Sequence, residues 1–263
     1  MPDPLLLDSI TKAGEAARRR VVVTGSHGGI YAAALALAAG CRATVFHDAG
    51  VGLDRAGIGG LGWLDGHGMA AAAVDHRSAA IGQAAEMLAG GLLSYTNAAA
   101  TACGVLPGMT CAEAARRLVA APEPSAAPPL PAESRVVMTP AGSCRRLVLV
   151  DSAALVHPDD AGQVVVTGSH GALFGADPAH ALKADAALAL FNDAGGGPGT
   201  GRLPVLAARG IAAATVAAGT ARIGEAHSTW QDGVISACNA PAAALGAHPG
   251  MPAADLVRRA LAQ

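Results

Sequence analysis

The sequence predicts an α/β protein built from two tandem-duplicated lobes. The octapeptide VVVTGSHG occurs at residues 21–28 and again at residues 164–171, and a chain of 263 residues would not repeat eight residues by chance. Around both copies, short β-branched apolar runs are followed by alanine-rich stretches of helical length, which is typical of βαβ units in a parallel sheet. We therefore expect two similar lobes related by pseudo-twofold symmetry.

The repeat extends well beyond the octapeptide. At nearly constant spacing, segments of the first half recur in the second half: Asp8-Ser9 with Asp151-Ser152, Phe46-His47-Asp48-Ala49-Gly50 with Phe191-Asn192-Asp193-Ala194-Gly195, Ile81-Gly82 with Ile223-Gly224, and Pro107-Gly108-Met109 with Pro249-Gly250-Met251. A period above one hundred residues indicates a duplicated domain, because solenoid units repeat at roughly 20 to 50 residues. The matches predict lobe 1 at residues 1–121, a connection at 122–146 and lobe 2 at 147–263.

Each lobe is expected to form a mainly parallel sheet with flanking helices, a Rossmann-like arrangement. The predicted strands are the short apolar runs at residues 5–7, 21–23, 43–46 and 70–74, and at 147–150, 164–166, 188–191 and 212–216. The predicted helices follow the two octapeptides, Gly57 and Gly201, and Ile81 and Ile223, and they end the lobes at 111–119 and 253–262. Four polar residues fall in alanine-rich stretches that we expect to be helical: Ser94, Asn97, Ser236 and Asn239.

The connection is rich in proline, which excludes a regular helix between residues 122 and 146. Its apolar tripeptide Val136-Val137-Met138 predicts a short extended segment that docks on one lobe. Upstream of the connection, Thr110 and Glu113 have the spacing of a capping box, which predicts the start of the helix at 111–119.

The composition excludes several classes of partner. The net charge is -2 and the 18 basic residues are scattered, so the chain lacks the basic surface that nucleic acid or an anionic membrane requires. Aromatic residues make up 3% of the chain, too few for stacking on single-stranded nucleic acid. Five cysteines form no CxxC pair, and neither a secretory leader nor an 18-residue apolar run is evident. We expect a cytoplasmic protein with buried thiols.

Polar residues follow the predicted strands at the point where each strand ends. In parallel α/β sheets, ligands bind outside the carboxyl ends of the strands. The four aspartates at these positions are therefore candidates for binding or acid–base chemistry, although an Asx turn or a helix cap is the alternative: Asp8, Asp48, Asp151 and Asp193.

The Thr-Gly-Ser-His-Gly turn of each octapeptide is the strongest candidate site. At the start of a helix, its free amides would hold a carboxylate, a phosphate or a developing oxyanion. A P-loop is excluded because the turn does not fit GxxxxGK[ST] and the only lysines are Lys12 and Lys183, and the dinucleotide pattern GxGxxG is absent. The alternative is that the turn only satisfies backbone groups at a strand–helix junction. The residues concerned are Ser26, His27, Ser169 and His170 with the glycines Gly25, Gly28, Gly168 and Gly171.

The two lobes differ after their fourth predicted strands. Lobe 2 carries Arg222, Glu225 and His227, with Arg222 and His227 expected about one turn apart on one helix, whereas lobe 1 offers Asp75-His76-Arg77. Arg222 suits bidentate binding of a carboxylate. This difference indicates either one asymmetric site built from both lobes or one working and one relaxed site, unless these residues are only the polar start of an exposed helix.

We expect a cofactor-independent enzyme, a hydrolase or lyase, acting at the lobe interface on a small metabolite that carries a carboxylate or an amide. His27 or His170 would be the general acid or base, oriented by Asp48 or Asp193, while Ser26 and Ser169 help to hold the oxyanion. The two aspartates after the first strands, the octapeptide glycines, Arg222, Glu225 and His227 would bind substrate. The pattern contains no metal-binding motif such as HExxH. An isomerase or racemase with paired bases and a binding module that only captures an anion are the alternatives. Apolar alanine-rich helices also predict a homo-oligomer.

Overall fold

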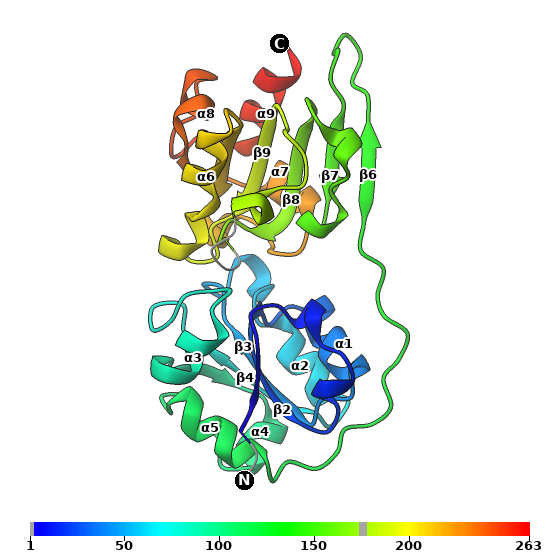
Figure 1. The fold of residues 1–263 in the computed structure, drawn as a ribbon, viewed down its shortest axis with the longest axis vertical. Coiled ribbons are helices and arrows are strands. Elements are labelled where there is room, and N and C mark those ends of the chain that lie inside the picture. The colour runs from blue at the N-terminus through cyan, green and yellow to red at the C-terminus, as the bar shows by residue number, and fades with distance from the viewer. Residues whose placement is uncertain (1–2, 174–177) are drawn as a thin grey trace. The chain divides into compact units, whose positions relative to one another are not determined.

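The computed structural model describes residues 3–173 and 178–263, which form two compact units (Figure 1). Unit 1 comprises Met1–Val51 and Arg55–Pro131, and unit 2 comprises Gly52–Asp54 and Ala132–Gln263. Each unit contains one sheet of mostly parallel strands flanked by helices, which confirms the predicted α/β class. Within the described residues, no helix is both long and apolar enough to cross a membrane.

The sheet of unit 1 has its strands in sequence order. Its first four strands are parallel, and the fifth is antiparallel to the fourth. The strands are β1 (Leu5–Leu7), β2 (Val21–His27), β3 (Ala43–His47), β4 (Ala70–Val74) and β5 (Leu93–Thr96). The α-helices are α1 (Ile30–Ala38), α2 (Gly59–Asp65), α3 (Ala84–Gly90), α4 (Ala98–Ala102) and α5 (Cys111–Leu118), and short 3-10 helices are η1 (Ile10–Lys12), η2 (Glu15–Ala17) and η3 (Leu53–Arg55).

Both faces of this sheet are buried, because alternate side chains of each strand point to opposite sides. Val22 and Phe46 pack on one face with residues of α1 and α2, whereas Val21, Val23 and Val45 pack on the other face with residues of α3, α4 and α5. This burial explains why each strand is a continuous apolar run in the sequence. It also explains why polar residues follow each run, where the strand leaves the core.

The sheet of unit 2 has the order β11-β10-β9-β8-β7-β6, with an antiparallel strand at each edge. Its strands are β6 (Arg135–Met138), β7 (Leu147–Val150), β8 (Val164–His170), β9 (Leu188–Asn192), β10 (Ala212–Val216) and β11 (Ile235–Cys238). Its helices are α6 (Arg202–Ala208), α7 (Ala226–Gln231), α8 (Ala240–Ala244) and α9 (Ala253–Leu261), with 3-10 helices η4 (Ala153–Leu155), η5 (Pro158–Asp160), η6 (Pro178–Ala181), η7 (Gly197–Thr200) and η8 (Ala218–Thr220).

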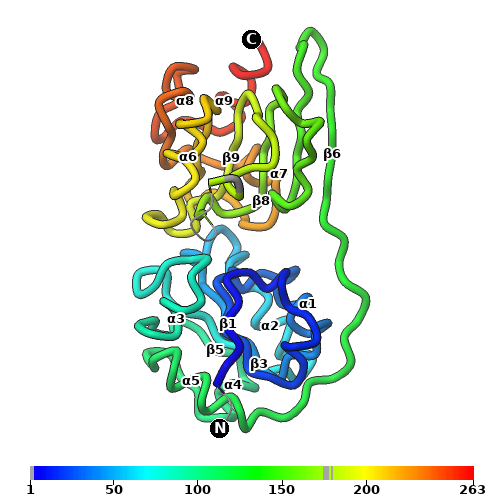
Figure 2. Tube along the Cα trace, in the orientation of Figure 1, coloured from blue at the N-terminus to red at the C-terminus, as the bar shows by residue number. Residues whose placement is uncertain are grey.

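The connection behaves as its composition predicts. From residue 122 to residue 134 it contains no helix or strand (Figure 2), and it then forms β6, which pairs antiparallel with β7. The expectation that Val136–Met138 docks on one lobe is confirmed. Thr110 caps α5 by accepting a hydrogen bond from the Glu113 amide at 3.2 Å, as the capping-box spacing indicated.

Several sequence-based expectations are wrong in detail. Ser94 and Ser236 lie on the antiparallel strands β5 and β11 and not in helices, because Leu-Ser-Tyr-Thr and Ile-Ser-Ala-Cys pair with β4 and β10 before the alanine-rich helices α4 and α8 begin. Asn97 and Asn239 are the N-caps of α4 and α8, where each side chain accepts from an amide of the first turn. Arg222 precedes α7 instead of lying on it with His227.

The octapeptides also differ from the predicted turn. Strands β2 and β8 continue to His27 and His170, with an irregular register before the histidine in each strand. An α-helix follows at Ile30 in unit 1, whereas the segment after β8 lies partly outside the described residues and includes only η6 among them.

Gly25 and Gly168 sit where two backbones approach too closely for a side chain. A Cβ atom on Gly25 would lie 2.6 Å from the Cα of Gly82, and one on Gly168 would lie 2.5 Å from the carbonyl carbon of Gly224. The approach is maintained by hydrogen bonds from the Gly82 amide to the Gly25 carbonyl at 2.9 Å and from the Gly224 amide to the Gly168 carbonyl at 2.7 Å. These contacts give both glycines a packing role.

Replacing either Gly25 or Gly168 by Ala should therefore destabilise the protein by about 1–3 kcal/mol, because backbone atoms must move apart. Gly62 provides the matched control, since it lies within α2 and a Cβ there would meet nothing within 4 Å. Gly62→Ala should stabilise the protein by about 0.5–1 kcal/mol through its helix propensity. Urea denaturation of the three variants measures both effects, and equal stability of Gly25→Ala and wild type would contradict the packing role.

Candidate functional site

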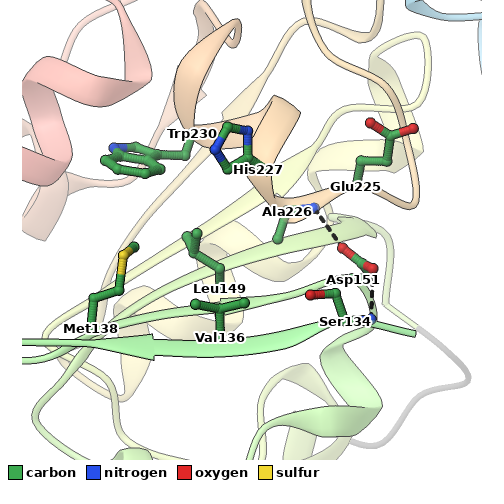
Figure 3. A pocket seen from close by; sticks show the side chains of 9 residues that line it. All are labelled: Ser134, Val136, Met138, Leu149, Asp151, Glu225, Ala226, His227 and Trp230. Atoms are coloured by element: carbon green, nitrogen blue, oxygen red, sulfur yellow. Dashed lines mark hydrogen bonds between the residues drawn. The ribbon is translucent and has the colours of Figure 1, made fainter. Parts of the chain in front are cut away.

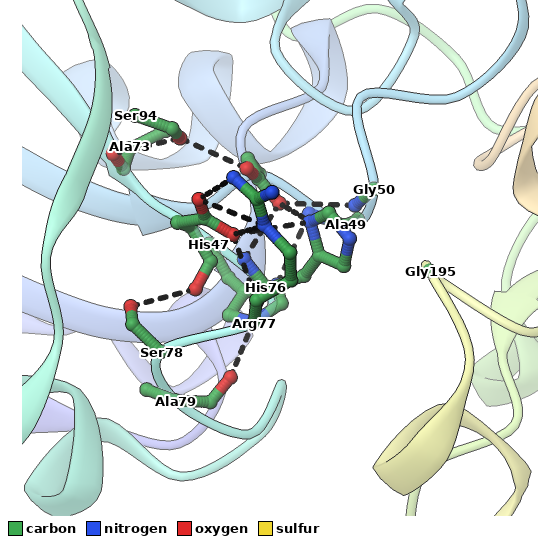
Figure 4. A network of polar contacts seen from close by, with 12 residues as sticks. His47, Ala49, Gly50, Ala73, His76, Arg77, Ser78, Ala79, Ser94 and Gly195 are labelled. Carbon is green, nitrogen blue, oxygen red and sulfur yellow. Dashed lines mark hydrogen bonds and ion pairs between the residues drawn. The ribbon is translucent and has the colours of Figure 1, made fainter.

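Four polar side chains converge at the carboxyl edge of the unit 1 sheet (Figure 4). Asp48 directly follows β3, Asp75 and His76 directly follow the neighbouring strand β4, and Ser94 lies on β5, which pairs with β4. The strand order places these residues side by side, although 46 positions separate Asp48 from Ser94.

Asp48 is the centre of this cluster. Its carboxylate is 2% exposed, and its Oδ1 accepts hydrogen bonds from the backbone amides of Gly50 and His76, each at 3.0 Å. Oδ1 also lies 3.0 Å from Nδ1 of His76, while Oδ2 accepts from the Ser94 hydroxyl at 2.9 Å. Two amides and a hydroxyl thus satisfy the oxygens of this buried carboxyl group.

The Asp48 carboxylate also orients the imidazole of His76. An ionised carboxylate only accepts hydrogen bonds, so Nδ1 of His76 is the protonated nitrogen and the lone pair of the neutral ring is on Nε2. Among the described residues, Nε2 makes no hydrogen bond, and the side chain of His76 is 26% exposed. A histidine held this way by a buried carboxylate can take up a proton at Nε2 and release it again.

Asp75 and Arg77 border the histidine. The Arg77 guanidinium donates from Nε to Oδ1 of Asp75 at 2.9 Å and from a terminal nitrogen to Oδ2 at 2.5 Å. These hydrogen bonds lower the pKa of Asp75 to about 2. The pair brings one cation to the edge of the site on a side chain that is 79% exposed, so Arg77 is accessible to an anionic group from solvent.

The same cluster has the composition of a metal site. One ligand atom from each of Asp48, Asp75 and His76 lies within 4.8 Å of the others, and carboxylate and imidazole groups are ordinary ligands of divalent transition metals. Arg77, however, holds both oxygens of Asp75. A metal would have to displace Arg77 from the carboxylate and compete for the proton on Nδ1 of His76.

Unit 2 repeats the backbone part of this arrangement without the histidine. Oδ1 of Asp193 accepts from the amides of Gly195 at 3.0 Å and Ala218 at 2.9 Å, as Asp48 accepts from Gly50 and His76. Ala218 thus stands in the place of His76, and Ser236 bonds Thr215 at 3.0 Å instead of an aspartate. The carboxylate cage is common to both units, whereas the imidazole belongs to unit 1.

His47 makes structural hydrogen bonds in unit 1, and Asn192 makes the corresponding bonds in unit 2. Nδ1 of His47 accepts from the Ala49 amide at 3.0 Å, and its Nε2 lies 3.0 Å from the Ala79 carbonyl. In unit 2, the side chain of Asn192 makes the same two kinds of bond: its Oδ1 accepts from the Ala194 amide at 2.8 Å, and its Nδ2 donates to the Ala221 carbonyl at 3.2 Å. A neutral imidazole with its proton on Nε2 and a carboxamide are interchangeable here, and burial lowers the pKa of His47.

The octapeptide side chains are tied to their own units. Nδ1 of His27 accepts from the Gly29 amide at 3.1 Å, and Nδ1 of His170 accepts from the Ala172 amide at 3.2 Å. Ser26 and Ser169 accept from the backbone of η1 and η4, from the amides of Ile10 and Ala153, each at 2.9 Å. These bonds lie within turns and short connections, so both copies of the octapeptide make the same local contacts. The chemical roles expected for these residues stay predictions.

The remaining predicted residues make contacts within their own units, and Asp151, Glu225 and His227 line one pocket of unit 2. Asp8 and Asp151 accept from the first amides of α3 and α7, at Ala84 and Ala226, each at 3.0 Å. Gly28 and Gly171 lie in close contacts, where a Cβ atom would meet the Leu61 side chain at 2.8 Å and would overlap the Gly199 carbonyl oxygen, respectively. Arg222 is 3.7 Å from a carboxylate oxygen of Glu225 and 3.5 Å from one of Asp232, and His227 packs edge-on against Trp230.

The backbone next to Asp48 is strained. Ala49 and Val51 have φ values of 50° and 65°, a left-handed conformation that is unfavourable for any side chain and especially for a β-branched one. Strained backbone of this kind is concentrated at functional sites, where the surrounding structure maintains it. Ala194 has a φ of 51° at the matching place in unit 2, so the strain accompanies the carboxylate cage in both units.

The sequence predicted a site role for Asp48, but it pointed to Asp75-His76-Arg77 only as a difference between the lobes and placed Ser94 in a helix. A signal was present: His76 stands where the second repeat has Ala218, two residues after the matched valines Val74 and Val216. What the sequence could not supply was the bond from Nδ1 to Asp48, because 28 positions separate the two residues.

The chain matches no known family model, and no curated protein or solved structure is significantly similar to it.

The half-buried octapeptide residue His27 makes a testable contribution to the pH dependence of stability. Burial, followed by the nearby His47, lowers the pKa of His27 from 6.5 to about 4, so the unfolded chain binds a proton at higher pH than the folded protein does. Stability should thus be complete above pH 6.5 and should fall as the pH drops toward 4, by about 2–3 kcal/mol at pH 4.5. Guanidinium denaturation at pH 7 and pH 4.5 measures the loss.

His27→Asn is the comparison, because Asn keeps an acceptor near the position of Nδ1 but does not titrate. Between pH 7 and pH 4.5, the His27→Asn variant should lose about 2–3 kcal/mol less stability than wild type does. Working above pH 4 avoids the titration of Asp75, whose pKa is lowered to about 2. An identical loss in both proteins would show that His27 titrates normally in the folded state.

Proposed function

We propose that unit 1 carries the acid–base centre of a cofactor-independent hydrolase or lyase. The hydrogen bond between Asp48 and Nδ1 of His76, at 3.0 Å, is the observation that supports it. In the reaction, Nε2 of His76 takes a proton from water or from a carbon next to a carbonyl, and Asp48 stabilises the imidazolium that forms. The same Nε2 then returns the proton to the leaving group.

The proposed substrate is a small metabolite with a carboxylate or an amide. Arg77 is adjacent to His76 and 79% exposed, and its guanidinium can bind a carboxylate in a bidentate manner. Asp75 competes with the substrate for Arg77, so binding exchanges one carboxylate for another. Pairing of Arg77 with the substrate carboxylate favours anionic over neutral substrates, while the displaced Asp75 carboxylate turns to solvent.

We also propose that the two units arose by duplication and that unit 2 kept the scaffold but not the base. The recurring bonds of Asp48 and Asp193, and of His47 and Asn192, support common descent. Ala218 in the place of His76 supports one working and one relaxed site. A racemase with two matched bases is less well supported, because the unit 2 carboxylate lacks an imidazole partner among the described residues.

A metal-dependent hydrolase is the second candidate, favoured by the convergence of Asp48, Asp75 and His76 within 4.8 Å. Isothermal titration with Zn²⁺ and Mn²⁺ distinguishes it from the first. Binding with a dissociation constant in the micromolar range or below, abolished by Asp75→Ala, would favour the metal. The acid–base proposal expects turnover that EDTA treatment does not change.

A substrate screen tests the proposed activity directly. Purified protein is incubated with a set of N-acyl amino acids, dicarboxylic monoamides, carboxylate esters and hydroxy acids, and products are detected by mass spectrometry. We expect conversion of at least one anionic compound in the wild-type protein and none in His76→Ala. Conversion by both proteins at equal rates would reject His76 as the base, and capture of a ligand without any conversion would favour a binding module. Light scattering on the same sample tests the expected homo-oligomer.

A further inference from the structure

Unit 2 contains a pocket of about 330 Å³ that is separate from its carboxylate cage (Figure 3). One wall is formed by the edge of the sheet, with Val136 and Met138 of β6 and Leu149 of β7. The opposite wall is α7, which contributes His227 and Trp230. The pocket therefore lies between a helix and the two strands at one edge of the sheet, and its size matches small-molecule sites.

The walls of this pocket are apolar and partly aromatic. Figure 3 shows Met138, Leu149 and Val136 facing Trp230 and His227 across the cavity. His227 packs edge-on against Trp230, with ring centroids 5.8 Å apart and planes inclined by 82°. A flat or branched apolar group would gain the contacts that an indole face and aliphatic side chains offer.

One end of the pocket is acidic. Asp151 and Glu225 line it there, and none of the described lining residues is lysine or arginine. Arg222, outside the lining, lies 3.7 Å from a carboxylate oxygen of Glu225, so the negative charge of this end comes mainly from Asp151. Asp151 is held in place because its Oδ1 accepts from the Ala226 amide at 3.0 Å and its Oδ2 accepts from the Ser134 amide at 2.8 Å. These bonds join the start of α7 to the chain entering β6 and leave the charge of Asp151 beside the cavity.

Asp151 has a counterpart in Asp8, but three other side chains of the pocket occur only in the second repeat. Matching Ile81-Gly82 with Ile223-Gly224 places Gln83 opposite Glu225, Ala85 opposite His227 and Leu88 opposite Trp230. The wall made by β6 comes from the proline-rich connection, which has no counterpart before β1 in the described part of unit 1. Glu225, His227 and Trp230 thus occur in the repeat in which β6 closes the cavity.

We infer that this pocket is a binding site for a small organic cation with an apolar, preferably aromatic, body. The protonated nitrogen lies at the acidic end near Asp151 and Glu225, and the body lies against Trp230, Val136 and Met138. Coulombic attraction and the indole face both favour a cation over an anion of the same shape. This site is distinct from the acid–base centre of unit 1 and takes ligands of the opposite charge.

Tryptophan fluorescence tests the inference. The chain has two tryptophans, so Trp63→Phe leaves Trp230 as the sole indole reporter. We expect 2-phenylethylamine to change the emission in a saturable way, with a dissociation constant in the millimolar range or tighter. The isosteric acid 3-phenylpropionate should bind at least tenfold more weakly. No saturable change, or equal binding of the acid, would overturn the inference.

Neighbouring valines of β6 provide a matched pair of variants. Val136 lines the pocket and is 43% exposed, whereas Val137 does not line it and is 42% exposed. In the Trp63→Phe background, Val136→Phe should fill the cavity and weaken amine binding at least tenfold, and Val137→Phe should leave it unchanged. Equal binding by both variants would place the amine elsewhere.

Glu225→Gln is a second test that does not depend on the packing of β6, because this side chain is exposed. It should weaken 2-phenylethylamine binding about three- to tenfold while leaving the neutral analogue 2-phenylethanol unaffected. Loss of both ligands, or of neither, would reject the proposed contact between the ammonium group and the acidic end.

Discussion

Replacing His76 by Ala is expected to lower turnover by about two to four orders of magnitude, the usual contribution of a positioned general acid or base. The loss should appear in kcat more than in KM, because the imidazole acts on the transferred proton, whereas Arg77 holds the substrate. Stability should change little, since the His76 side chain is only partly buried and the His76 amide keeps its bond to Asp48. Steady-state kinetics on the substrate found by screening gives both constants.

Two aspartates supply the matched control for this prediction. Asp48→Asn and Asp193→Asn remove the same charge from the same backbone cage, but only Asp48 orients an imidazole. In Asp48→Asn, the carboxamide can present either a donor or an acceptor to Nδ1 of His76. The proton is then no longer fixed on Nδ1 and the lone pair no longer on Nε2, so kcat should fall by about 10²–10⁴. Asp193→Asn should retain kcat within about threefold.

Equal losses in the two Asn variants would mean that the cages are structural and that His76 does not act as the base. The split between the kinetic constants adds a readout that a purely structural role would not produce. Asp48→Asn should lower kcat far more than it raises KM, because Asp48 acts on the imidazole and not on the substrate.

Replacing Arg135 by Ala is expected to destabilise the protein by about 3–5 kcal/mol, the cost of leaving a buried charge without its partner. Asp160 is fully buried, and Arg135 donates to its two oxygens at 2.9 and 3.1 Å. The His157 amide supplies a third bond at 2.8 Å. Because Arg135 begins β6, the ion pair also anchors the connection to unit 2.

The exposed pair of Arg258 and Asp255 is the control. Its nitrogen–oxygen distance is 3.0 Å, but the Arg258 side chain is 75% exposed, so Arg258→Ala should cost at most about 1 kcal/mol. Urea denaturation at pH 7 compares both variants. Equal effects of Arg135→Ala and Arg258→Ala would show that the burial of Asp160 carries no penalty once Arg135 is removed.

The pH dependence of this effect has a defined sign. Burial raises the pKa of Asp160, but the bonds from Arg135 and the His157 amide outweigh it, and the pKa is lowered from 3.8 overall. The ion pair therefore contributes stability above pH 3.8 that is lost as the pH falls through the lowered value. In Arg135→Ala, the hydrogen bonds from Arg135 no longer offset the burial of Asp160, so the pKa of Asp160 rises. The variant should therefore lose less stability on acidification than wild type does.

The predictable part of the fold is the part set by short-range sequence patterns. The apolar runs of the eight parallel strands were found, with end positions shifted by up to four residues, because strands buried on both faces require continuous apolar sequence. The helix at Cys111–Leu118 and its cap at Thr110 were found for the same local reason. The strands β5 and β11 were missed, since Ser94 and Ser236 interrupt their apolar pattern within alanine-rich surroundings.

The candidate site was only half predictable. That Asp48 stands at the carboxyl edge of a sheet follows from its position after an apolar run. That His76, and not His27, is the imidazole bonded to it does not follow, because both histidines end or follow a strand in the same way. The choice depends on which atoms come within 3 Å of each other, and spacing along the chain carries no such information.

The sequence by itself determined the α/β class, the internal repeat of the octapeptide, the proline-rich connection and the edge of the sheet on which polar groups gather. These features depend on periodicity and on steric rules that act over a few residues. Only the tertiary structure decided that Asp48 meets His76 and Ser94, that Asn192 replaces His47, and that β6 closes a pocket against α7. The physical reason is that hydrogen bonds and cavities depend on distances between segments far apart in the chain, which strand order and packing fix only when the whole sheet has formed.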